Sequence, residues 1–439
     1  MRKKTDAYLE QKQEELLKDI RELVRIPSLH GDVQNCTAAL EYVRRRAQDF
    51  GLKTSMTAEK DVCVIELGDG PETVGVLTHV DVVGIGDPQK WTYPPLDMTI
   101  DKGAIWGRGT ADDKGPVMIS LYVLRAIKEL GIPLKKKICL IVGSCEEGIW
   151  TDMEHFKEQF PAPDHGFTPD GAFPIYNVEK GYADICLTFS EPEGCRITRL
   201  LAGDSRNTIP SRAVIQLKGG EEIAYDGISA HSSAPESADN AIIKMCKDRE
   251  KLYPFNFMKF IDRFLSDCHV PQLKLDDGTE FYNGEYAGKT TAAPTVISAE
   301  NGVVTVNVNI RHRFGNTGES ILARFREHER EYNFKARLIE CQDPIMVSEK
   351  LPSLRLMQQV YESYGHKSEF CLAPGCTYAK ALENFVCWGP FFPDDVDRVH
   401  MEDECLSIKT IMEAAKIYAA YLVLDGSESG PERPEQAEG

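Results

Sequence analysis

Three short apolar runs constrain the fold of this chain more than any other feature. They are VCVIEL at 62–67, TVGVLT at 73–78 and KICLIVG at 137–143. Between the last two lies PVMISLYVLRAIKELG, which starts at Pro116 and ends at Gly131, residue types that favour the first turn and the end of a helix. Strands that alternate with helices are typical of a parallel α/β sheet. The sequence therefore predicts an α/β domain.

The pattern changes from about residue 183, where alternating strands are joined by turns. TVISAENGVVTVNVNIRHR predicts a hairpin around Asn301-Gly302, a favoured two-residue turn. The α/β pattern returns near residue 344, and 439 residues are too many for one hydrophobic core. We therefore expect a catalytic domain in two parts, an inserted α+β lid domain and a disordered polar tail, over 1–182 with 344–424, 183–343 and 425–439.

Charge and composition exclude several partners. The 69 acidic residues outnumber the 51 basic ones, for a net charge of -18, which argues against nucleic acid as a partner. The amino terminus is charged throughout, and no segment approaches the run of about 20 apolar residues that spans a bilayer. The 13 cysteines form no CxxC pair, which is typical of a reduced protein. We expect a cytoplasmic protein with no membrane partner.

Residues with metal-binding side chains follow the apolar runs. His79 and Asp81 come after the run at 73–78, and Glu146 and Glu147 follow the run at 137–143. Ligands gather outside the carboxyl ends of parallel strands. A His there can bind metal while a carboxylate fixes its tautomer, although each motif alone also fits a polar loop. Two adjacent glutamates supply the roles that metal-assisted hydrolysis needs, a ligand and a proton acceptor.

Three further segments extend this set. WGRGTADDKG at 106–115 precedes the predicted helix, and such a glycine-rich turn could instead cradle a phosphate. It lacks the GxxxxGK[ST] arrangement, and the carboxylates of Asp112 and Asp113 suit a divalent cation better. Asp170 in TPDG and His400 in DRVHMEDE are uninformative alone. Together these imidazoles and carboxylates suit zinc or manganese, and they suffice for two ions that share one bridging carboxylate.

The motifs HVDVV, GRGTADDKG, Glu-Glu after a strand, TPDGAFPIYNVEKG and the late His occur in this order. From about residue 10 to 420 the chain thereby resembles the dizinc exopeptidase and deacylase superfamily, in particular its peptidase V and carnosinase-like dipeptidases. The resemblance implies a metallopeptidase catalytic domain of α/β class, with a mixed, mostly parallel sheet and an inserted α+β lid. It also implies hydrolysis of dipeptides by a metal-bridged hydroxide, with two divalent ions that are Zn²⁺ or alternatively Mn²⁺ or Co²⁺.

The resemblance assigns roles to matched residues. Glu146 would be the general base and pass the proton to the leaving amine, and Asp81 would orient His79. Asp112 would bridge the ions and be followed by a cis peptide bond, while Asp113 would support the geometry. The implied metal ligands are His79, Asp112, Glu147, Asp170 and His400.

The lid carries the segment DGISAHSSAPE, which resembles the family segment whose His polarises the scissile carbonyl. This match assigns His231 to stabilising the oxyanion. Asn207 in RNTIPSRA and Arg311 in VNIRHRF match positions that hold the substrate backbone and its terminal carboxylate. Arg313 lies close enough to Arg311 to leave that register open.

One segment departs from the family pattern. The family's glycine loop reads close to GGGTYAR, and its backbone amides approach the substrate carboxylate. Here the loop reads PGCTYAK at 374–380, which leaves Gly375 as the matching contact and puts Lys380 in place of an Arg. The substrate thus stays open between a small peptide and an N-acyl amino acid, which a deacylase would cleave at the same metal site. The alternative from another functional class is a non-catalytic protein that binds a metal or a peptide. In either case we expect a monomer or a homodimer.

Overall fold

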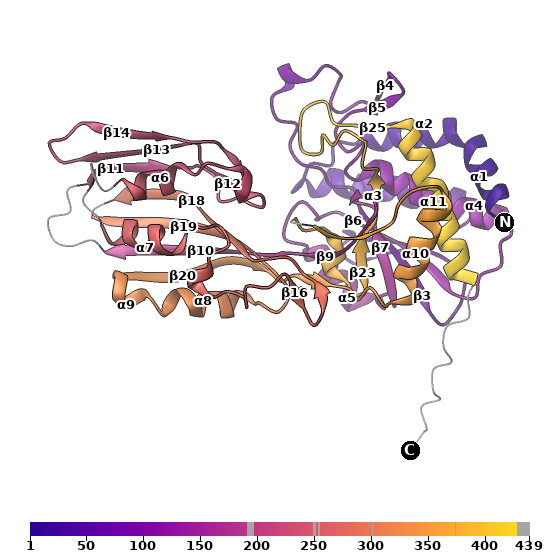
Figure 1. The fold of residues 1–439 in the computed structure, drawn as a ribbon. Helices are drawn as coiled ribbons and strands as arrows, with labels where there is room; N and C mark the ends of the chain where they lie inside the picture. Colours follow the sequence, from indigo (N-terminus) through magenta and orange to yellow (C-terminus); the bar gives the residue numbers. More distant parts are fainter. Residues whose placement is uncertain (191–196, 249–251, 253–254, 301, 374, 428–439) are drawn as a thin grey trace. The chain divides into compact units, whose positions relative to one another are not determined.

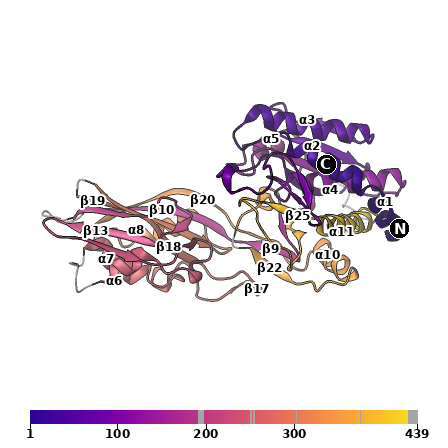
Figure 2. The same cartoon turned by 90° about the horizontal axis from the view of Figure 1, so that it is seen from above.

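The computed structural model describes residues 1–190, 197–248, 252, 255–300, 302–373 and 375–427. Over these residues the chain forms two compact units, whose elements are labelled in Figures 1 and 2. The α/β unit comprises Met1–Asn177, Val347–Cys371 and the residues from Thr377 onward, and the antiparallel unit comprises Val178–Met346 and Leu372–Cys376. The domain boundaries expected from the sequence, 182/183 and 343/344, lie a few residues from these positions.

A mixed sheet forms the core of the α/β unit. Its strand order is β1 (Lys53–Met56), β2 (Cys63–Leu67), β6 (Lys137–Gly143), β3 (Thr73–His79), β7 (His165–Thr168), β23 (Phe385–Cys387) and β9 (Ile175–Glu179). The α/β class and the mixed sheet are confirmed. However, parallel pairing is confined to β6, β3, β7 and β23, whereas we expected it over most of the sheet. Residues 57–62 join β1 to β2 and are too few for the crossover that a parallel pair needs, so this pair is antiparallel.

Helices pack on this sheet, and α4 (Lys114–Glu129) confirms the helix predicted from Pro116 to Gly131. The helices of the unit are α1 (Arg2–Gln11), α2 (Gln13–Val24), α3 (Val33–Asp49), α4 (Lys114–Glu129), α5 (Thr151–Gln159), α10 (Pro352–Ser363) and α11 (Ile408–Ser427). α4 and α11 contact each other and both contact β3 and β6. α4 has Pro116 in its first turn and is followed by Gly131 with φ +62°, which a glycine adopts without strain. α11 extends to Ser427, so the expected tail begins inside a helix, and its residues 428–439 lie outside the described residues.

The apolar spacing of residues 6–25 predicts one amphipathic helix, but the structure divides this segment between two helices. The chain turns at Lys12, which separates α1 from α2. α1 buries Leu9, and α2 buries its own stripe of Leu16, Ile20 and Val24 among others. The polar run EQKQEE at 10–15 lies between the two stripes and offers no apolar side chain that would hold one continuous axis.

The antiparallel unit is a separate α+β domain, as predicted. Its sheet has the order β14 (Glu222–Asp226), β13 (Arg212–Leu217), β11 (Ile197–Ala202), β18 (Thr291–Glu300), β19 (Val303–His312), β10 (Gly181–Ser190) and β20 (Phe334–Gln342). The predicted hairpin is β18–β19, in which Glu300 pairs with Val303; Asn301 of its turn lies outside the described residues. The helices of this unit are α6 (Ala241–Lys247), α7 (Asn256–Phe264), α8 (Gly318–Arg326) and α9 (Glu329–Tyr332).

Short elements complete both units. In the α/β unit β4 (Thr99–Asp101), β5 (Ala104–Trp106) and β25 (Cys405–Ser407) form a small sheet, and β8 (Gly171–Ala172) pairs with β24 (Pro390–Phe391). In the antiparallel unit β12 (Thr208–Ile209) pairs with β15 (Ala230–His231), and β16 (Phe281–Tyr282) pairs with β17 (Glu285–Tyr286). β21 (Ile345–Met346) and β22 (Phe370–Ala373) pair with β9. The 3₁₀ turns are η1 (Pro88–Lys90), η2 (Pro235–Ser237), η3 (Pro271–Leu273) and η4 (Tyr378–Ala381).

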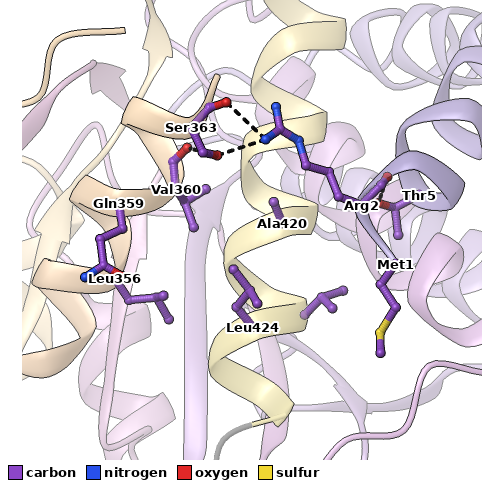
Figure 3. Close-up of a pocket in the computed structure, with 10 residues that line it drawn as sticks. Met1, Arg2, Thr5, Leu356, Gln359, Val360, Ser363, Ala420 and Leu424 are labelled. Atoms are coloured by element: carbon purple, nitrogen blue, oxygen red, sulfur yellow. Dashed lines mark hydrogen bonds between the residues drawn. The ribbon is translucent and has the colours of Figure 1, made fainter. Parts of the chain in front are cut away.

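A pocket between α1, α10 and α11 is lined mainly by apolar side chains, including Leu356, Val360 and Leu424 (Figure 3). Arg2 crosses it and donates hydrogen bonds to the main-chain oxygen and the hydroxyl of Ser363, at 3.0 and 3.1 Å. No residue predicted for the functional site lines this pocket. Among the described helices, none combines the length and the apolar character needed to cross a membrane.

Candidate metal centre

Three parallel strands end at one edge of the sheet and bring predicted site residues together there. His79 is the last residue of β3 and pairs with Gly143, the last residue of β6. Glu146 and Glu147 follow β6 within a few residues, and Asp170 follows β7. The strand-end placement inferred from the sequence therefore has a direct structural cause, because parallel neighbours finish on the same side of a sheet.

His79 is fully buried and is held through one ring nitrogen. Its Nδ1 donates to the main-chain carbonyl of Asp81 at 2.9 Å, while the Asp81 carboxylate lies 3.3 Å away. This leaves Nε2 as the ring nitrogen available to a metal ion. It lies 3.0 Å from Asp112 Oδ1 and 3.8 Å from Asp170 Oδ2, without the geometry of a hydrogen bond to a described residue. Burial acts to lower the pKa of His79, but the surrounding carboxylates raise it well above its usual value.

Asp112 stands between two groups of potential ligands. Its Oδ1 lies 3.0 Å from His79 Nε2, and its Oδ2 lies 3.0 Å from His400 Nε2. His400 Nε2 is also 3.2 Å from Glu147 Oε1. The structure thus assembles His79 with Asp112 and Asp170, and Asp112 with Glu147 and His400, and Asp112 belongs to both groups.

The two groups fit divalent cations on distance and on chemistry. Two ligands of one tetrahedral zinc ion, each about 2.1 Å from it, are about 3.4 Å apart. The imidazole–carboxylate separations here are 3.0 to 3.8 Å. Imidazole nitrogens with carboxylate oxygens are the donors that zinc, manganese and cobalt accept. The buried Nε2 of His79 lacks a hydrogen bond to a described residue, and such an ion would satisfy it.

The clustering of carboxylates at this site also favours a bound cation. Burial raises the pKa of Glu146 well above its usual value, and the charges of Asp170, Glu147 and Asp112 raise it further. Burial likewise raises the pKa of Glu147, and burial together with the charge of Asp112 raises that of Asp170. The two carboxylates that contact His400, Asp112 and Glu147, raise its pKa to about 11. A divalent cation relieves this repulsion, because its charge compensates the excess carboxylates.

Buried carboxylates behind the centre hold its loops in place. Asp113 accepts the main-chain N–H of His79 at 3.1 Å, and the Asp112–Asp113 peptide bond is cis, as the resemblance implied. Glu404 accepts the main-chain N–H groups of Ala111 and Asp112, at 2.9 and 3.2 Å. Sequence reasoning missed Glu404, although it lies four residues after His400 in the same acidic motif.

Glu404 depends in turn on Arg108, which comes from the GRGTADDKG motif. Arg108 Nη1 lies 2.6 Å from Glu404 Oε2, and both side chains are almost completely buried. Burial raises the pKa of Glu404 to about 7, and the charge of Asp112 adds to this effect while Arg108 opposes it. Removing Arg108 would therefore leave a buried carboxylate without its compensating charge.

We expect Arg108→Ala to lower the free energy of unfolding by about 3–5 kcal/mol, the usual cost of breaking a buried ion pair from one side. Denaturant unfolding of the metal-free protein measures this change. Arg25→Ala is the matched control, because its contacts with Glu22 and Asp97 are exposed, and it should change stability little. An equally small effect of Arg108→Ala would contradict the assigned role.

A second support sits behind the Glu146–Glu147 loop. The Asp152 carboxylate accepts the main-chain N–H groups of Ser144 and Cys145, at 2.7 and 3.0 Å, and accepts the Tyr378 hydroxyl at 2.5 Å. The buried Tyr378 ring also packs edge-on against His79, with centroids 5.9 Å apart. Tyr378 lies in the segment that departs from the family's glycine loop. The segment keeps the Thr-Tyr-Ala of the family pattern, and this was the sequence feature that could have indicated Tyr378.

The remaining predicted residues lie in the antiparallel unit. Arg311 is buried on β19, and its Nη2 donates to Ser232 Oγ at 3.4 Å. The main-chain N–H of Ser232, next to His231, donates to the main-chain oxygen of Asn207 at 2.8 Å. Arg311 and Asn207 line one pocket of this unit. Gly375 belongs to the same unit, and Pro374 lies outside the described residues.

The α/β fold and the imidazole–carboxylate donor set are those of a metallopeptidase, and comparisons with known proteins agree. Residues 75–423 match Peptidase family M20/M25/M40. The chain is 29% identical over 457 residues to "Putative dipeptidase YtjP" of Bacillus subtilis (strain 168), over 93% of this chain and 96% of that protein. Because the family match spans most of its length, the chain belongs to Peptidase family M20/M25/M40. The resemblance seen in the sequence is thereby confirmed, and the chain is an enzyme of the hydrolase class.

Solved structures agree on the fold. Human carnosine dipeptidase 1 aligns with a TM-score of 0.64 at 15% identity, over 96% of this chain and 98% of that one. Aminoacylhistidine dipeptidase from Vibrio alginolyticus aligns with a TM-score of 0.68 at 14% identity, over 94% of this chain and 97% of that one. These alignments cover both the α/β unit and the antiparallel unit.

Proposed function

We propose that this enzyme hydrolyses the amide bond of dipeptides with the help of two divalent metal ions, Zn²⁺ in the first instance. One observation carries the proposal: Asp112 presents one carboxylate oxygen to His79 and the other to His400, which is the arrangement that two ions sharing a ligand require. The dipeptidase names of the relatives support the choice of substrate.

One ion would be held by His79, Asp112 and Asp170, and the other by Asp112, Glu147 and His400. Ions of this kind, when bound, lower the pKa of a water molecule and polarise a carbonyl oxygen. The protein orients the ligands through groups behind them, such as the Asp81 carbonyl on His79 and Asp113 on the His79 amide.

Glu146 would take the proton from the attacking water and pass it to the departing amine. Its main chain is fixed on both sides, since its N–H donates to Asp81 at 3.2 Å and its carbonyl accepts Trp150 Nε1 at 2.8 Å. In the metal-free protein, burial and the neighbouring carboxylates raise the pKa of Glu146.

His231 would donate a hydrogen bond to the oxyanion that develops during attack. The main-chain N–H of Ser233 donates to His231 Nδ1 at 3.2 Å, so Nδ1 is an acceptor and the ring proton is on Nε2. Burial lowers the pKa of His231, and the charge of Arg311 lowers it further, which favours this neutral donor. Arg311, Asn207 and Gly375 stay assigned to the substrate's carboxylate and backbone by their motifs.

We expect His231→Ala to lower kcat by about 10²–10³-fold with a smaller change in KM, because the lost contact forms only in the transition state. Steady-state kinetics on a cleaved dipeptide measure both constants. Ser233→Ala, which keeps the main-chain donor to Nδ1, should cost much less. An unchanged kcat in His231→Ala would remove this residue from the mechanism.

The proposal also covers the cellular location and the oligomeric state of the enzyme. We place the enzyme in the cytoplasm, since every described cysteine is a free thiol, as expected in a reducing compartment. We expect a monomer or a homodimer, which size-exclusion chromatography with light scattering distinguishes.

Release of free amino acids from a substrate panel tests the proposed function. The panel contains ordinary dipeptides, β-alanyl-histidine, a tripeptide, and acetyl- and succinyl-amino acids, each with chelator and with added Zn²⁺ or Mn²⁺. Metal-dependent cleavage confined to dipeptides is the expected result. Cleavage of acylated amino acids alone would instead identify a deacylase, and metal binding without any hydrolysis would favour a non-catalytic binding protein.

A further inference from the structure

We propose that His30 is a positioning residue for the Glu146–Glu147 loop and that it acts through the carboxylate of Asp81. The inference rests on the proposed function, because it assumes that Glu147 is a metal ligand and Glu146 the base. It adds a residue that the family motifs do not include: His30 belongs to none of the segments that carry the resemblance.

Asp81 is the point where His30 and the loop meet. The Asp81 carboxylate is completely buried and accepts the main-chain N–H groups of Glu146 and Glu147, at 3.2 and 3.1 Å. His30 Nδ1 lies 3.1 Å from the oxygen that accepts the Glu147 N–H, and it donates, since a carboxylate accepts. The Asp81 carboxylate therefore accepts three hydrogen bonds, one from the His30 ring and two from the main-chain amides of the loop.

The main chain around His30 is paired with the segment that carries Asp81. The N–H of His30 donates to the carbonyl of Val82 at 2.9 Å, and the N–H of Val82 donates to the carbonyl of Ser28 at 2.9 Å. Leu29 and Val82 form a parallel bridge. The main chain that carries the imidazole is thus fixed by pairing at His30 and at the two residues before it, which lowers the entropy lost when the ring contacts Asp81.

The ring also packs directly on the loop. A Cβ atom built on Gly148, the residue after Glu147, would lie 2.1 Å from His30 Cε1 and 2.4 Å from Nε2. Such distances are impossible for real atoms, so the ring occupies the space that only a glycine leaves open. His30 therefore fixes the loop in two ways, by a hydrogen bond to its anchor and by contact with its next residue.

This arrangement has a specific consequence for function. Groups that hold a metal ligand from behind change metal affinity or activity by about 10- to 100-fold when they are removed. The His30 side chain is 37% exposed, so its loss opens no enclosed cavity and should leave the stability of the metal-free protein nearly unchanged. Function and stability should therefore respond differently to substitution of His30.

The first test compares His30→Ala, His30→Asn and the control His366→Ala. His366 forms a similar contact with Glu413 at 2.8 Å in the same unit, but none of its described partners belongs to the candidate centre. For each variant we would measure Zn²⁺ affinity by competition with a chromogenic chelator, kcat and KM on a cleaved dipeptide, and thermal unfolding without metal. In His30→Ala, affinity for one Zn²⁺ and kcat should fall by about 10- to 100-fold, while KM and the unfolding temperature change little.

Rescue by the conservative variant separates positioning from simple packing. The side-chain amide of Asn places a donor near the position of Nδ1, so His30→Asn should recover most of the lost affinity and kcat. His366→Ala should match the wild type in both. Wild-type Zn²⁺ affinity and kcat in His30→Ala would overturn the inference, and so would an Asn variant no better than Ala.

A double-mutant cycle with Gly148 gives independent support, because it tests the contact between His30 and Gly148 directly. Gly148→Ala must displace the His30 ring, so by itself it should reduce affinity and kcat as His30→Ala does. In the double variant the new methyl group finds space, and the combined loss should be no larger than that of His30→Ala alone. Multiplicative losses in the double variant would contradict the contact.

The proposal and the proposed function fail differently. If wild-type protein binds two Zn²⁺ and cleaves dipeptides, but the His30 and Gly148 variants behave like it, only the positioning role is wrong. If the wild type binds Zn²⁺ and cleaves nothing, the role of His30 is still decided by comparing the Zn²⁺ affinity of His30→Ala with that of the wild type. If the wild type binds no Zn²⁺, the proposed function is overturned and this inference with it.

Discussion

Replacing Glu146 with Gln should lower kcat by about 10²–10⁴-fold, the usual contribution of a general acid–base residue, while the bound metal remains. Gln keeps the size of the side chain but cannot accept the water's proton. The loop itself should stay in place, because Asp81 and Trp150 hold Glu146 through its main chain. Steady-state kinetics together with metal analysis of the purified variant measure the two effects separately.

Glu154→Gln on α5 is the matched control for this substitution. It removes an exposed carboxylate from the same unit and should leave kcat and metal content unchanged. Wild-type turnover in Glu146→Gln would assign the proton transfer to another group. Loss of metal along with activity would instead mean that Glu146 is a ligand.

Asp112→Ala should have the largest effect on metal binding, because Asp112 belongs to both ligand groups. We expect it to lose tight binding of both Zn²⁺ ions and to reduce activity by more than the 10- to 100-fold loss typical of a residue behind a ligand. Asp170→Ala, which disrupts only the group around His79, should retain about one ion per chain. Metal content after dialysis, measured by elemental analysis, distinguishes the two variants.

Zn²⁺-dependent stabilisation checks the same point without any substrate. A ligand that binds only the folded state raises its stability by about 2.7 kcal/mol at 100 times Kd. Added Zn²⁺ should therefore raise the unfolding temperature of the wild type and leave that of Asp112→Ala unchanged. Equal metal content in Asp112→Ala and Asp170→Ala would contradict a shared role for Asp112.

The proximity of several candidate ligands could be predicted from the sequence because its main determinants are local. His79 and the Glu146–Glu147 pair directly follow apolar runs that form β3 and β6, and parallel strands leave their following residues at one edge. Asp112 precedes a helix whose start is marked by Pro116. His400 could be joined to this set only through the family resemblance, since it lies 253 positions from its neighbour Glu147 and follows no predicted strand.

The supporting residues could not be predicted in the same way. These residues act through contacts with main-chain groups or with residues far away in the sequence, as seen for Glu404, Tyr378 and His30. The spacing of residues in the sequence does not predict such pairs. Each supporting residue lies in a segment whose local pattern is that of an ordinary polar loop. The extent of parallel pairing was also not predicted. The pairs β1–β2, β2–β6 and β23–β9 are antiparallel, and the short connection between β1 and β2 explains only the first of them.

A crystal structure of the enzyme grown with Zn²⁺, with anomalous diffraction data collected at the zinc edge, tests the central claim most directly. We predict two anomalous peaks, one contacted by His79, Asp112 and Asp170 and the other by Asp112, Glu147 and His400, separated by the roughly 3.5–4 Å of two-metal hydrolases. A single peak, or two peaks of which Asp112 contacts only one, would contradict the shared two-ion centre.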